Sequence, residues 1–333
     1  MPEFRQNMVT KQWVIIAPER GKRPKEFTKK KETKSLPKSD KNCPFCLGNE
    51  NKTPKPVYTI KKNGRWRIRV VPNKFAALKQ GLNPARKKEG RAKKYLRAEG
   101  FGIAEVVIET PAHHKTIATM SYSEVSDIIA SYKARYKDLA EHKNISMITI
   151  FRNHGMMAGT SLVHPHSQII ATPIVPPHIR NQIFQARVAF DTYGRCIYCD
   201  MLKEELSEKK RVIAETEHFV VFSPYASRFP FETNIIPKKH NSSFDAISKR
   251  EADDFAKVLR DTMKRIYLVL DNPDYNYIIR SCPTDERNAK YYHWYAALIP
   301  RLSTPAGFEL GTGIYINVTS PEDAARLLRK AKI

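Results

Sequence analysis

The chain has 333 residues and a formal net charge of +24, with 41% hydrophobic and 28% charged residues. This length allows two domains, or one domain built from two copies of a smaller unit. No apolar run approaches the roughly 20 residues that a membrane span needs, and the segment from Met1 to Ala17 lacks the layout of a secretory signal. We therefore expect a cytoplasmic protein without a membrane partner.

The positive charge is concentrated in the segment from Arg20 to Arg97, which contains 26 Lys or Arg residues against 5 Asp or Glu residues. Such a field attracts anions of any kind, so charge alone is compatible with nucleic-acid binding. The segment carries no helix-turn-helix, no RNA-recognition signature and no basic repeats interleaved with aromatic residues. A solvated lysine-rich surface, or a field that gathers phosphorylated substrates, explains it better than a nucleic-acid partner.

The first half begins with a Cys-x-x-Cys pair at 43–46, followed by two predicted strands at 67–73 and 105–110. A long helix at 121–142, a third strand at 147–151 and a His-x-His run at 164–166 complete it. The helix is predicted from Ser121 at its start and from apolar residues such as Val125, Ile128 and Ile129 at helical spacing. The second strand is followed by His113.

The second half repeats this order. Its Cys-x-x-Cys pair lies at 196–199, its first two strands at 219–222 and 233–236, its helix at 248–270, its third strand at 275–279 and its final histidine in the run 293–295. The distance from the middle histidine to the last is 51 residues between His113 and His164, and 53 residues between His240 and His293. Conserved order and spacing indicate an internal repeat.

Each repeat is predicted to be a set of antiparallel strands carrying one long helix, and the two units could join edge to edge into one larger sheet of an α+β fold. We place the first repeat at residues 1–175 and the second at 190–333. A linker is expected at 173–195, where Pro176 and Pro177 interrupt the pattern.

Four of the five cysteines form the two Cys-x-x-Cys pairs, which fits a reducing compartment with metal sites better than a disulfide framework. A tetrahedral zinc ion needs two further ligands besides two thiolates. We predict two structural zinc sites, formed by Cys43, Cys46, His113 and His164, and by Cys196, Cys199, His240 and His293. His114 competes with His113, which is preferred because it aligns with His240. The alternative to metal sites is that the cysteines are merely buried and the histidines lie on the surface. The fifth cysteine, Cys282, is expected to be a buried thiol.

The run His164-Pro165-His166-Ser167-Gln168 is the candidate reactive centre. A histidine that attacks phosphorus needs one neutral ring nitrogen, while an acceptor holds the proton on the other. Alternation along an extended segment points His164, His166 and Gln168 to the same side, so one histidine can serve a metal while the other enters the cleft. The amide of Gln168 can donate to a phosphoryl oxygen. A lone His-x-His run is more often a metal-binding or core feature than a catalytic one. Its position within the repeat strengthens the catalytic interpretation here. Tyr295 occupies the matching position in the second copy, which should therefore be catalytically silent.

Over nearly its whole length the chain resembles the galactose-1-phosphate uridylyltransferase family, a two-repeat branch of the histidine-triad superfamily. The run from Trp13 to Pro24 is similar to an N-terminal signature whose arginines, here Arg20 and Arg23, approach substrate phosphates. The segment from Pro72 to Phe75 is similar to the nucleoside-holding one, with Asn73 and Phe75. The resemblance assigns Asn153, Gly159 and Ser161 to the phosphate loop, and Phe308 and Glu309 to hexose contact. It makes His164 a zinc ligand, His166 the nucleophile and Gln168 its amide partner.

The resemblance implies a ping-pong reaction of a nucleotide sugar and a sugar 1-phosphate through a nucleotidyl-His166 intermediate, in a homodimer whose second subunit completes the sugar site. Three positions depart from the family pattern: Tyr295 stands where the second repeat normally keeps a further histidine, Phe308 replaces a usual tyrosine, and Ser303 stands near a usual lysine. A sister branch that resembles plant ADP-glucose phosphorylase has zinc in both halves and an aromatic residue after His-Trp, as this sequence does. UDP-glucose:hexose-1-phosphate uridylyl transfer is the first prediction. An ADP-glucose phosphorylase-like reaction with phosphate or another anion is the alternative, ahead of a nucleotidyl hydrolase and a nucleic-acid-binding protein.

Overall fold

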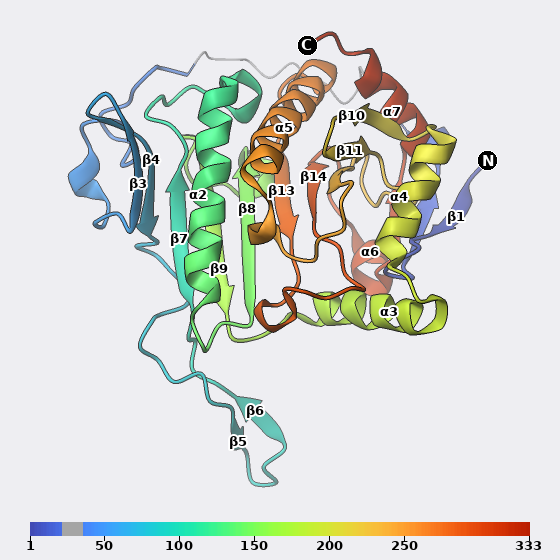
Figure 1. Ribbon diagram of the computed structural model, residues 1–333, viewed down its shortest axis with the longest axis horizontal. Helices are drawn as coiled ribbons and strands as arrows, with labels where there is room; N and C mark the ends of the chain where they lie inside the picture. Colours follow the sequence, from blue (N-terminus) through green and yellow to red (C-terminus); the bar gives the residue numbers. More distant parts are fainter. Residues whose placement is uncertain (22–35) are drawn as a thin grey trace.

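A ten-stranded sheet forms the centre of the computed structural model, which describes residues 1–21 and 36–333 (Figure 1). Its first half has the order β3 (Tyr58–Lys62), β4 (Arg65–Pro72), β7 (Ile103–Ile108), β9 (His166–Thr172) and β8 (Met147–His154). Its second half, read from the other edge, has the order β10 (Val212–Glu215), β11 (Phe219–Phe222), β12 (Thr233–Pro237), β14 (Tyr295–Pro300) and β13 (Tyr275–Arg280).

The two halves thus repeat one strand order, and they meet where β8 and β13 pair in antiparallel fashion, with Phe151 opposite Ile278. The α+β class and the single joined sheet predicted from the repeat are confirmed. The boundaries proposed for the two repeats remain a prediction.

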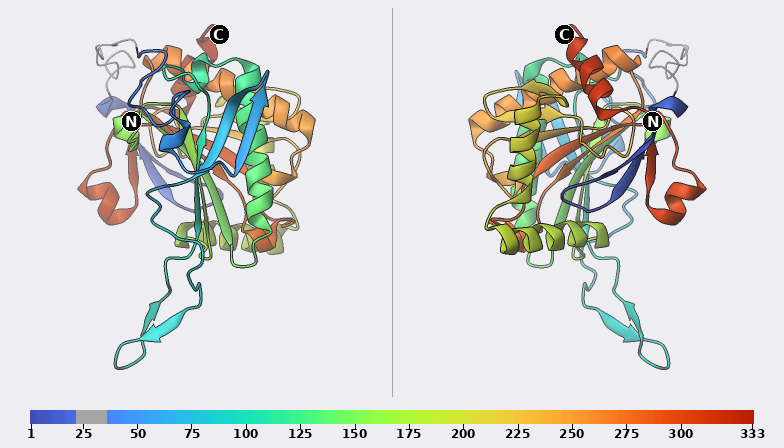
Figure 2. Two further views of the ribbon diagram at one scale, coloured as in Figure 1. Left: turned by 90° about the vertical axis from the view of Figure 1, so that its left-hand side faces the viewer. Right: turned by 90° about the vertical axis from the view of Figure 1, so that its right-hand side faces the viewer.

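One face of the sheet carries the long helices α2 (Tyr122–Ala140) and α5 (Lys249–Leu270), which lie side by side (Figure 2). Each begins at a serine whose hydroxyl accepts the backbone N–H of a glutamate three residues on, Ser121 with Glu124 and Ser248 with Glu251. These reciprocal capping boxes satisfy amides that the first helical turn leaves unpaired. The main hydrophobic core lies between these helices and the sheet, and α7 (Pro321–Lys330) extends it beside α5.

The opposite, outer face is covered by elements that the sequence did not predict. A small sheet of β1 (Glu3–Gln6), β2 (Trp13–Ile16) and β15 (Tyr315–Asn317) lies there with α6 (Gly307–Thr312), and α4 (Ile197–Glu208) packs in the same layer as a second core. Short 3-10 helices occur at Pro18–Arg20, Glu50–Lys52, Ile117–Thr119, Met156–Ala158, Phe244–Ala246 and Thr284–Glu286.

The linker predicted at 173–195 is wrong, because most of that segment is helix α3 (Pro177–Tyr193). Proline at the first helical position costs nothing, since its missing N–H would be unpaired there in any case. Ile179, Ile183 and Ala186 are buried at helical spacing, and Gly194 ends the helix in a left-handed conformation. The prolines mark the start of a helix here and not a break between domains.

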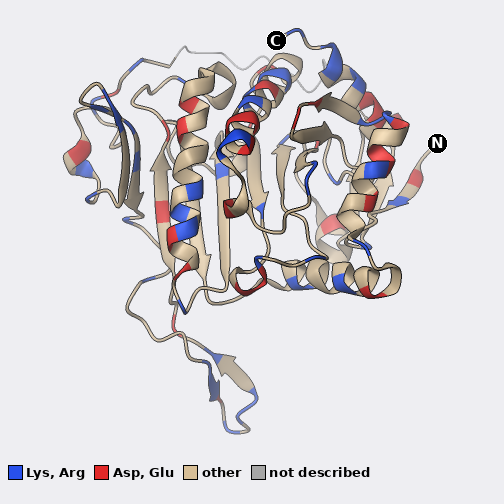
Figure 3. Cartoon of the chain, viewed as in Figure 1, with Lys and Arg blue, Asp and Glu red and all other residues tan. Residues whose placement is uncertain are grey.

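A hairpin of β5 (Lys87–Glu89) and β6 (Tyr95–Arg97) projects from the body of the molecule, and Lys and Arg predominate along it (Figures 1 and 3). It belongs to the basic segment that the sequence singled out. Within the described ranges, none of the helices is both long enough and apolar enough to cross a lipid bilayer.

Candidate active site and metal centres

His166 is the first residue of β9 and lies on the outer face of the sheet, with Gln168 on the same side. Between them, Ser167 is buried on the helix-covered face. The Nδ1 atom of His166 lies 2.8 Å from the carbonyl oxygen of His164. Because a carbonyl oxygen only accepts, Nδ1 carries the proton, and Nε2 keeps its lone pair. This is the tautomer that a nucleophilic imidazole requires.

The surroundings of His166 favour its neutral form. Burial lowers its pKa below the ordinary imidazole value, the hydrogen bond to the His164 carbonyl opposes that shift, and the positive charge of Arg152 lowers the pKa further. The ring of Phe45 meets that of His166 edge to face, with centroids 5.4 Å apart. The nucleophile candidate is thus held by a backbone acceptor on one side and an aromatic ring on the other.

A buried polar layer lies directly beneath this strand and was not predicted. Arg152 and Glu109 form an ion pair inside the protein, and the hydroxyl of Tyr132 donates to Ser167 at 2.7 Å. The hydroxyls of Tyr132 and Tyr277 are also hydrogen-bonded to each other. Arg152 and Tyr277 stand on the two strands that join the repeats, so this layer ties the floor of the candidate site to both halves of the chain.

The loop predicted to approach phosphate follows β8 and is anchored by the second repeat. The side chain of Asn276, on β13, donates to Asn153 Oδ1 at 2.8 Å and to the carbonyl oxygen of Ala158 at 3.0 Å. The Asp274 carboxylate accepts the backbone N–H of Met157 at 2.7 Å. A Cβ atom at Gly155 would lie 2.1 Å from that carboxylate, so this position requires glycine.

Gly159 adopts the left-handed conformation, with φ of +82°, and it closes the short helical turn of the loop. Ser161 follows and is exposed. The loop is therefore shaped by glycine geometry and fixed from outside by Asp274 and Asn276. No sequence pattern indicated those two residues, because they belong to the other repeat.

The remaining predicted substrate contacts lie farther from His166. Asn73 follows the end of β4, and its side chain accepts the backbone N–H of Phe75 at 2.9 Å. In the strand register Pro72 pairs with Glu105, whereas His166 pairs with Ile108. Three residues along a strand correspond to roughly 10 Å. Phe75 is 88% exposed.

Arg20 ends an exposed 3-10 turn, and Arg23 lies outside the described residues. Phe308 and Glu309 stand on α6, which packs beside β15, and Phe308 is 46% exposed. Among the described residues, no hydrogen bond, ion pair or ring contact joins Phe308 or Glu309 to His166.

The first Cys-x-x-Cys pair meets two histidines in a buried group: Cys43, Cys46, His113 and His164 offer ligand atoms that all lie within 4.8 Å of one another. The Nδ1 atoms of His113 and His164 lie 3.3 and 3.5 Å from Cys46 Sγ. The Nε2 atom of His164 is 2.8 Å from the Thr110 carbonyl oxygen, so it bears the proton and leaves Nδ1 free to bind a cation.

The environment of this group suits a metal. Burial lowers the pKa of His164 to about 4, so its ring is neutral, and burial raises the pKa of the Cys43 thiol to about 11. A thiolate at Cys43 is therefore stable here only beside a cation. His114 is exposed and points to no such group, in agreement with the preference for His113. Phe45 bridges the group to the nucleophile, since its ring centroid lies 6.0 Å from that of His164.

The second group contains Cys196, Cys199 and His240 but not the fourth predicted member, His293. The ring centroids of His240 and His293 are 5.3 Å apart, the same separation as between His113 and His164. The Nδ1 atom of His293 bonds the Trp294 carbonyl oxygen at 3.0 Å, and its Nε2 atom is buried without a hydrogen-bond partner. His293 thus lies beside the group, with Nδ1 bonded to the backbone and Nε2 without a hydrogen-bond partner.

Residues 1–176 match the model of the family described as galactose-1-phosphate uridyl transferase, N-terminal domain. The chain belongs to the galactose-1-phosphate uridyl transferase family. Residues 109–331 also match a domain of unknown function, DUF4921. The family named by the sequence resemblance is thereby confirmed, and with it the assignment of the chain as an enzyme of the nucleotidyltransferase type.

Relatives of the family extend over the whole chain. An ADP-glucose phosphorylase from Arabidopsis thaliana is 36% identical, with 100% of this chain and 93% of that protein covered. A galactose-1-phosphate uridylyltransferase from Thermotoga maritima is 30% identical, with 100% and 99% covered. The crystal structure of an Arabidopsis thaliana ADP-glucose phosphorylase with bound ADP-glucose superposes with a TM-score of 0.84 at 34% identity, covering 100% of both chains.

Replacement of Asn276 by alanine should loosen the loop at 155–161, because two hydrogen bonds that fix it are lost. We expect the backbone amides of Ala158, Gly159 and Thr160 to exchange hydrogen about 10-fold faster, which corresponds to roughly 1.4 kcal/mol. Hydrogen exchange followed by mass spectrometry measures this. The matched control is Asn51→Ala, at an exposed asparagine far along the chain, which should leave the loop unchanged. Equal protection in Asn276→Ala and wild type would contradict the anchoring role.

Proposed function

We propose that the protein transfers a nucleoside monophosphate from a nucleotide sugar to a phosphorylated acceptor through a covalent bond to His166. The observation that carries the proposal is the hydrogen bond from His166 Nδ1 to the His164 carbonyl oxygen, which leaves Nε2 as a lone-pair nucleophile on the outer face of the sheet. Burial keeps this imidazole neutral. The reaction that we propose first is UDP-glucose:hexose-1-phosphate uridylyl transfer, with galactose 1-phosphate as acceptor.

In the first half-reaction, Nε2 of His166 attacks the α-phosphorus, and the bond from that phosphorus to the bridging oxygen of the sugar phosphate breaks. Sugar 1-phosphate leaves, and the nucleotide remains on the imidazole. In the second half-reaction, a phosphate oxygen of the acceptor attacks the same phosphorus and restores the free histidine. Gln168, on the same side of β9, is suited to donate to a phosphoryl oxygen, and the loop carrying Asn153, Gly159 and Ser161 offers backbone donors.

A second candidate reaction is that of an ADP-glucose phosphorylase, in which an adenylyl group passes through His166 to inorganic phosphate or another anion. Two observations favour it. The identity of 36% to the Arabidopsis phosphorylase exceeds the 30% to the Thermotoga uridylyltransferase. A thiol and imidazole group is also present in the second repeat. The nucleophile and the chemical steps are the same in both candidates, which differ in the base and the acceptor.

We propose zinc as the ion at both Cys and His groups. Two thiols and two imidazoles are a donor set that tetrahedral zinc prefers, and four protein ligands leave no open position, so the first ion would be structural. Cys43, Cys46, His113 and His164 would hold it, and the ion would fix the strand start that presents His166. In the second group Cys196, Cys199 and His240 would hold the ion, and the unpaired Nε2 atom of His293 makes that residue the candidate fourth ligand.

We also propose that the enzyme is a cytoplasmic homodimer. All five cysteines are free, which suits a reducing compartment. Phe308 and Leu310 are exposed on α6, and a second subunit would bring such a segment to the sugar end of the site.

Incubation with donor labelled at the α-phosphate should leave an acid-labile, base-stable label on the protein. We expect labelling from UDP-glucose if the first candidate is right, and from ADP-glucose if the second is right. His166→Gly should abolish the label, because no other imidazole nitrogen occupies that position. His114→Gly, at an exposed neighbouring histidine, is the control and should label like wild type. Absence of label from both donors in the wild type would refute the covalent mechanism.

Metal analysis by inductively coupled plasma mass spectrometry should find about two zinc ions per chain. Cys46→Ala and Cys199→Ala should each lose one ion, whereas Cys282→Ala, at a buried cysteine outside both groups, should lose none. Cys46→Ala should also unfold at a lower temperature, because metal binding stabilises the folded state. Zinc retained in Cys46→Ala would show that the first group does not bind it.

Light scattering should give a mass about twice the 38.3 kDa of one chain. Glu309→Ala and His166→Gly chains should each be impaired alone, with Glu309→Ala roughly 10-fold slower through loss of a hydrogen-bonding carboxylate. Their co-expressed heterodimer should recover activity, because one of its two sites is then intact. Glu217→Ala, at an exposed carboxylate, is the control. A monomeric active enzyme, or failure of the heterodimer to recover, would contradict the shared site.

A further inference from the structure

The outer face of the second repeat contains a cavity that the reaction at His166 does not use. Two adjoining spaces of about 310 and 390 Å³ share walls that include Gln182, Asn234 and Tyr295. They lie between the turn that joins β1 to β2, helix α4 and the sheet. Spaces of this size are typical of sites for small organic ligands.

This cavity occupies the place that the nucleophile has in the first repeat. Tyr295 is the first residue of β14, as His166 is of β9, and those strands have matching positions in the sheet. Ala297 stands where the first repeat has Gln168, and the smaller side chain leaves space. Arg280 pairs with Tyr295 across β13 and β14. The second repeat therefore keeps the location of the site but lacks its imidazole.

One end of the cavity is cationic. Arg280 and Arg228 both line it, and Glu232 is the one carboxylate in that wall. Arg228 bonds Glu232 at 3.2 Å. In the described part of the chain, the side chain of Arg280 has only the ring nitrogen of His178 as hydrogen-bond partner, at 3.1 Å. A guanidinium group without a carboxylate partner, in a partly buried wall, is suited to bind a phosphate group.

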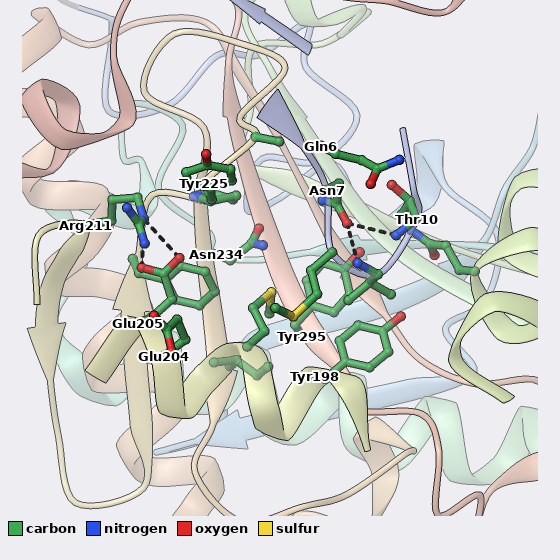
Figure 4. A pocket seen from close by; sticks show the side chains of 18 of the residues that line it. Gln6, Asn7, Thr10, Tyr198, Glu204, Glu205, Arg211, Tyr225, Asn234 and Tyr295 are labelled. Carbon is green, nitrogen blue, oxygen red and sulfur yellow. Dashed lines mark hydrogen bonds and ion pairs between the residues drawn. The ribbon is translucent and has the colours of Figure 1, made fainter. Parts of the chain in front are cut away.

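The other end is aromatic and contains buried polar atoms that lack partners. Tyr198 lies beside Tyr295, with ring centroids 6.1 Å apart, while Asn234 lies between them and the Arg211–Glu205 pair (Figure 4). Tyr198 is only 2% exposed, yet its hydroxyl has no hydrogen-bond partner.

Gln182 Oε1 and Asn234 Oδ1 are likewise buried and unpaired. Unpaired polar groups of this kind lower the stability of the protein, and a ligand that bonds to them can offset that cost. Met201, Phe222 and Tyr225 form the apolar part of the wall, which Glu204, Glu205, Glu208 and Arg211 also line. A flat heteroaromatic ring with polar edges matches this end.

We propose that this cavity is a second nucleotide site, which binds its ligand without reacting with it. The base lies among Tyr198, Tyr225 and the two amide side chains, and the phosphate lies on Arg280. Because Tyr295 replaces the imidazole, no nucleotidyl group is transferred there. Different residues form this cavity and the His166 site. The expected count of two nucleotides rests on the proposed function for the nucleotide at His166, whereas the effect of changing Arg280 tests the cavity by itself.

Equilibrium dialysis of the full-length protein against radiolabelled AMP and UMP tests the proposal. We expect two nucleotides per wild-type chain for the base that the protein accepts. Arg280→Gln should weaken one of the two sites roughly 10- to 100-fold, through loss of a charge-assisted phosphate contact. Ala297→Leu should close the cavity and remove the same site. Arg326→Gln, at an exposed arginine on α7, is the matched control and should bind two nucleotides.

Three results would overturn the proposal. The first is one nucleotide per wild-type chain, with no change in Arg280→Gln and Ala297→Leu. The second is displacement of the nucleotide from the Arg280-dependent site by inorganic phosphate or glucose 1-phosphate as readily as by nucleotide, which would show that no base is recognised. The third is loss of covalent labelling of His166 in Arg280→Gln, which would assign the cavity to the reaction itself. Retained labelling together with the loss of one bound nucleotide would support a separate site.

Discussion

The backbone pairing of β8 with β13 is the constraint on which the rest of the molecule depends. It joins the two repeats into one sheet and covers the strand edge that each repeat would otherwise expose. It also sets Asp274 and Asn276 beside the loop after β8, where they hold the loop through its backbone and through Asn153. The loop next to the candidate nucleophile is thus shaped by a contact between repeats.

The shared strand order makes the differences between the two outer faces informative. In the first repeat, a buried group of thiols and imidazoles packs through Phe45 against His166, whose proton is fixed by a backbone carbonyl. In the second repeat, the equivalent strand start carries Tyr295, the neighbouring strand carries Arg280, and a cavity opens in front of both. We propose that one face serves chemistry at a nitrogen lone pair and that the other encloses a ligand. Duplication of one scaffold therefore does not imply duplication of its function.

The buried layer beneath β9 explains how such a site stays rigid. The Arg152–Glu109 pair and the linked hydroxyls of Tyr132, Tyr277 and Ser167 lie between the long helices and the strands of both repeats. Breaking a buried network of this kind is costly, because each group left without its partner stays desolvated. The position of β9, and with it that of His166, is thereby coupled to the main core of the protein.

The sequence by itself determined the repeat, its order of strands and helices, the two Cys-x-x-Cys pairs and the histidine that follows the second strand of each repeat. Periodicity and spacing are local properties, so they can be recognised without knowledge of the tertiary contacts. It also placed His166 and Gln168 on one side of a strand, since alternation requires it. Only the tertiary structure decided that helix α3 occupies the expected linker and that Nδ1 of His293 bonds the backbone. It also decided that Asp274 and Asn276 hold the loop after β8, and that a cavity lies in the second repeat. These features arise where segments far apart in the chain meet, and side-chain orientation at such meetings follows from packing that no local pattern encodes.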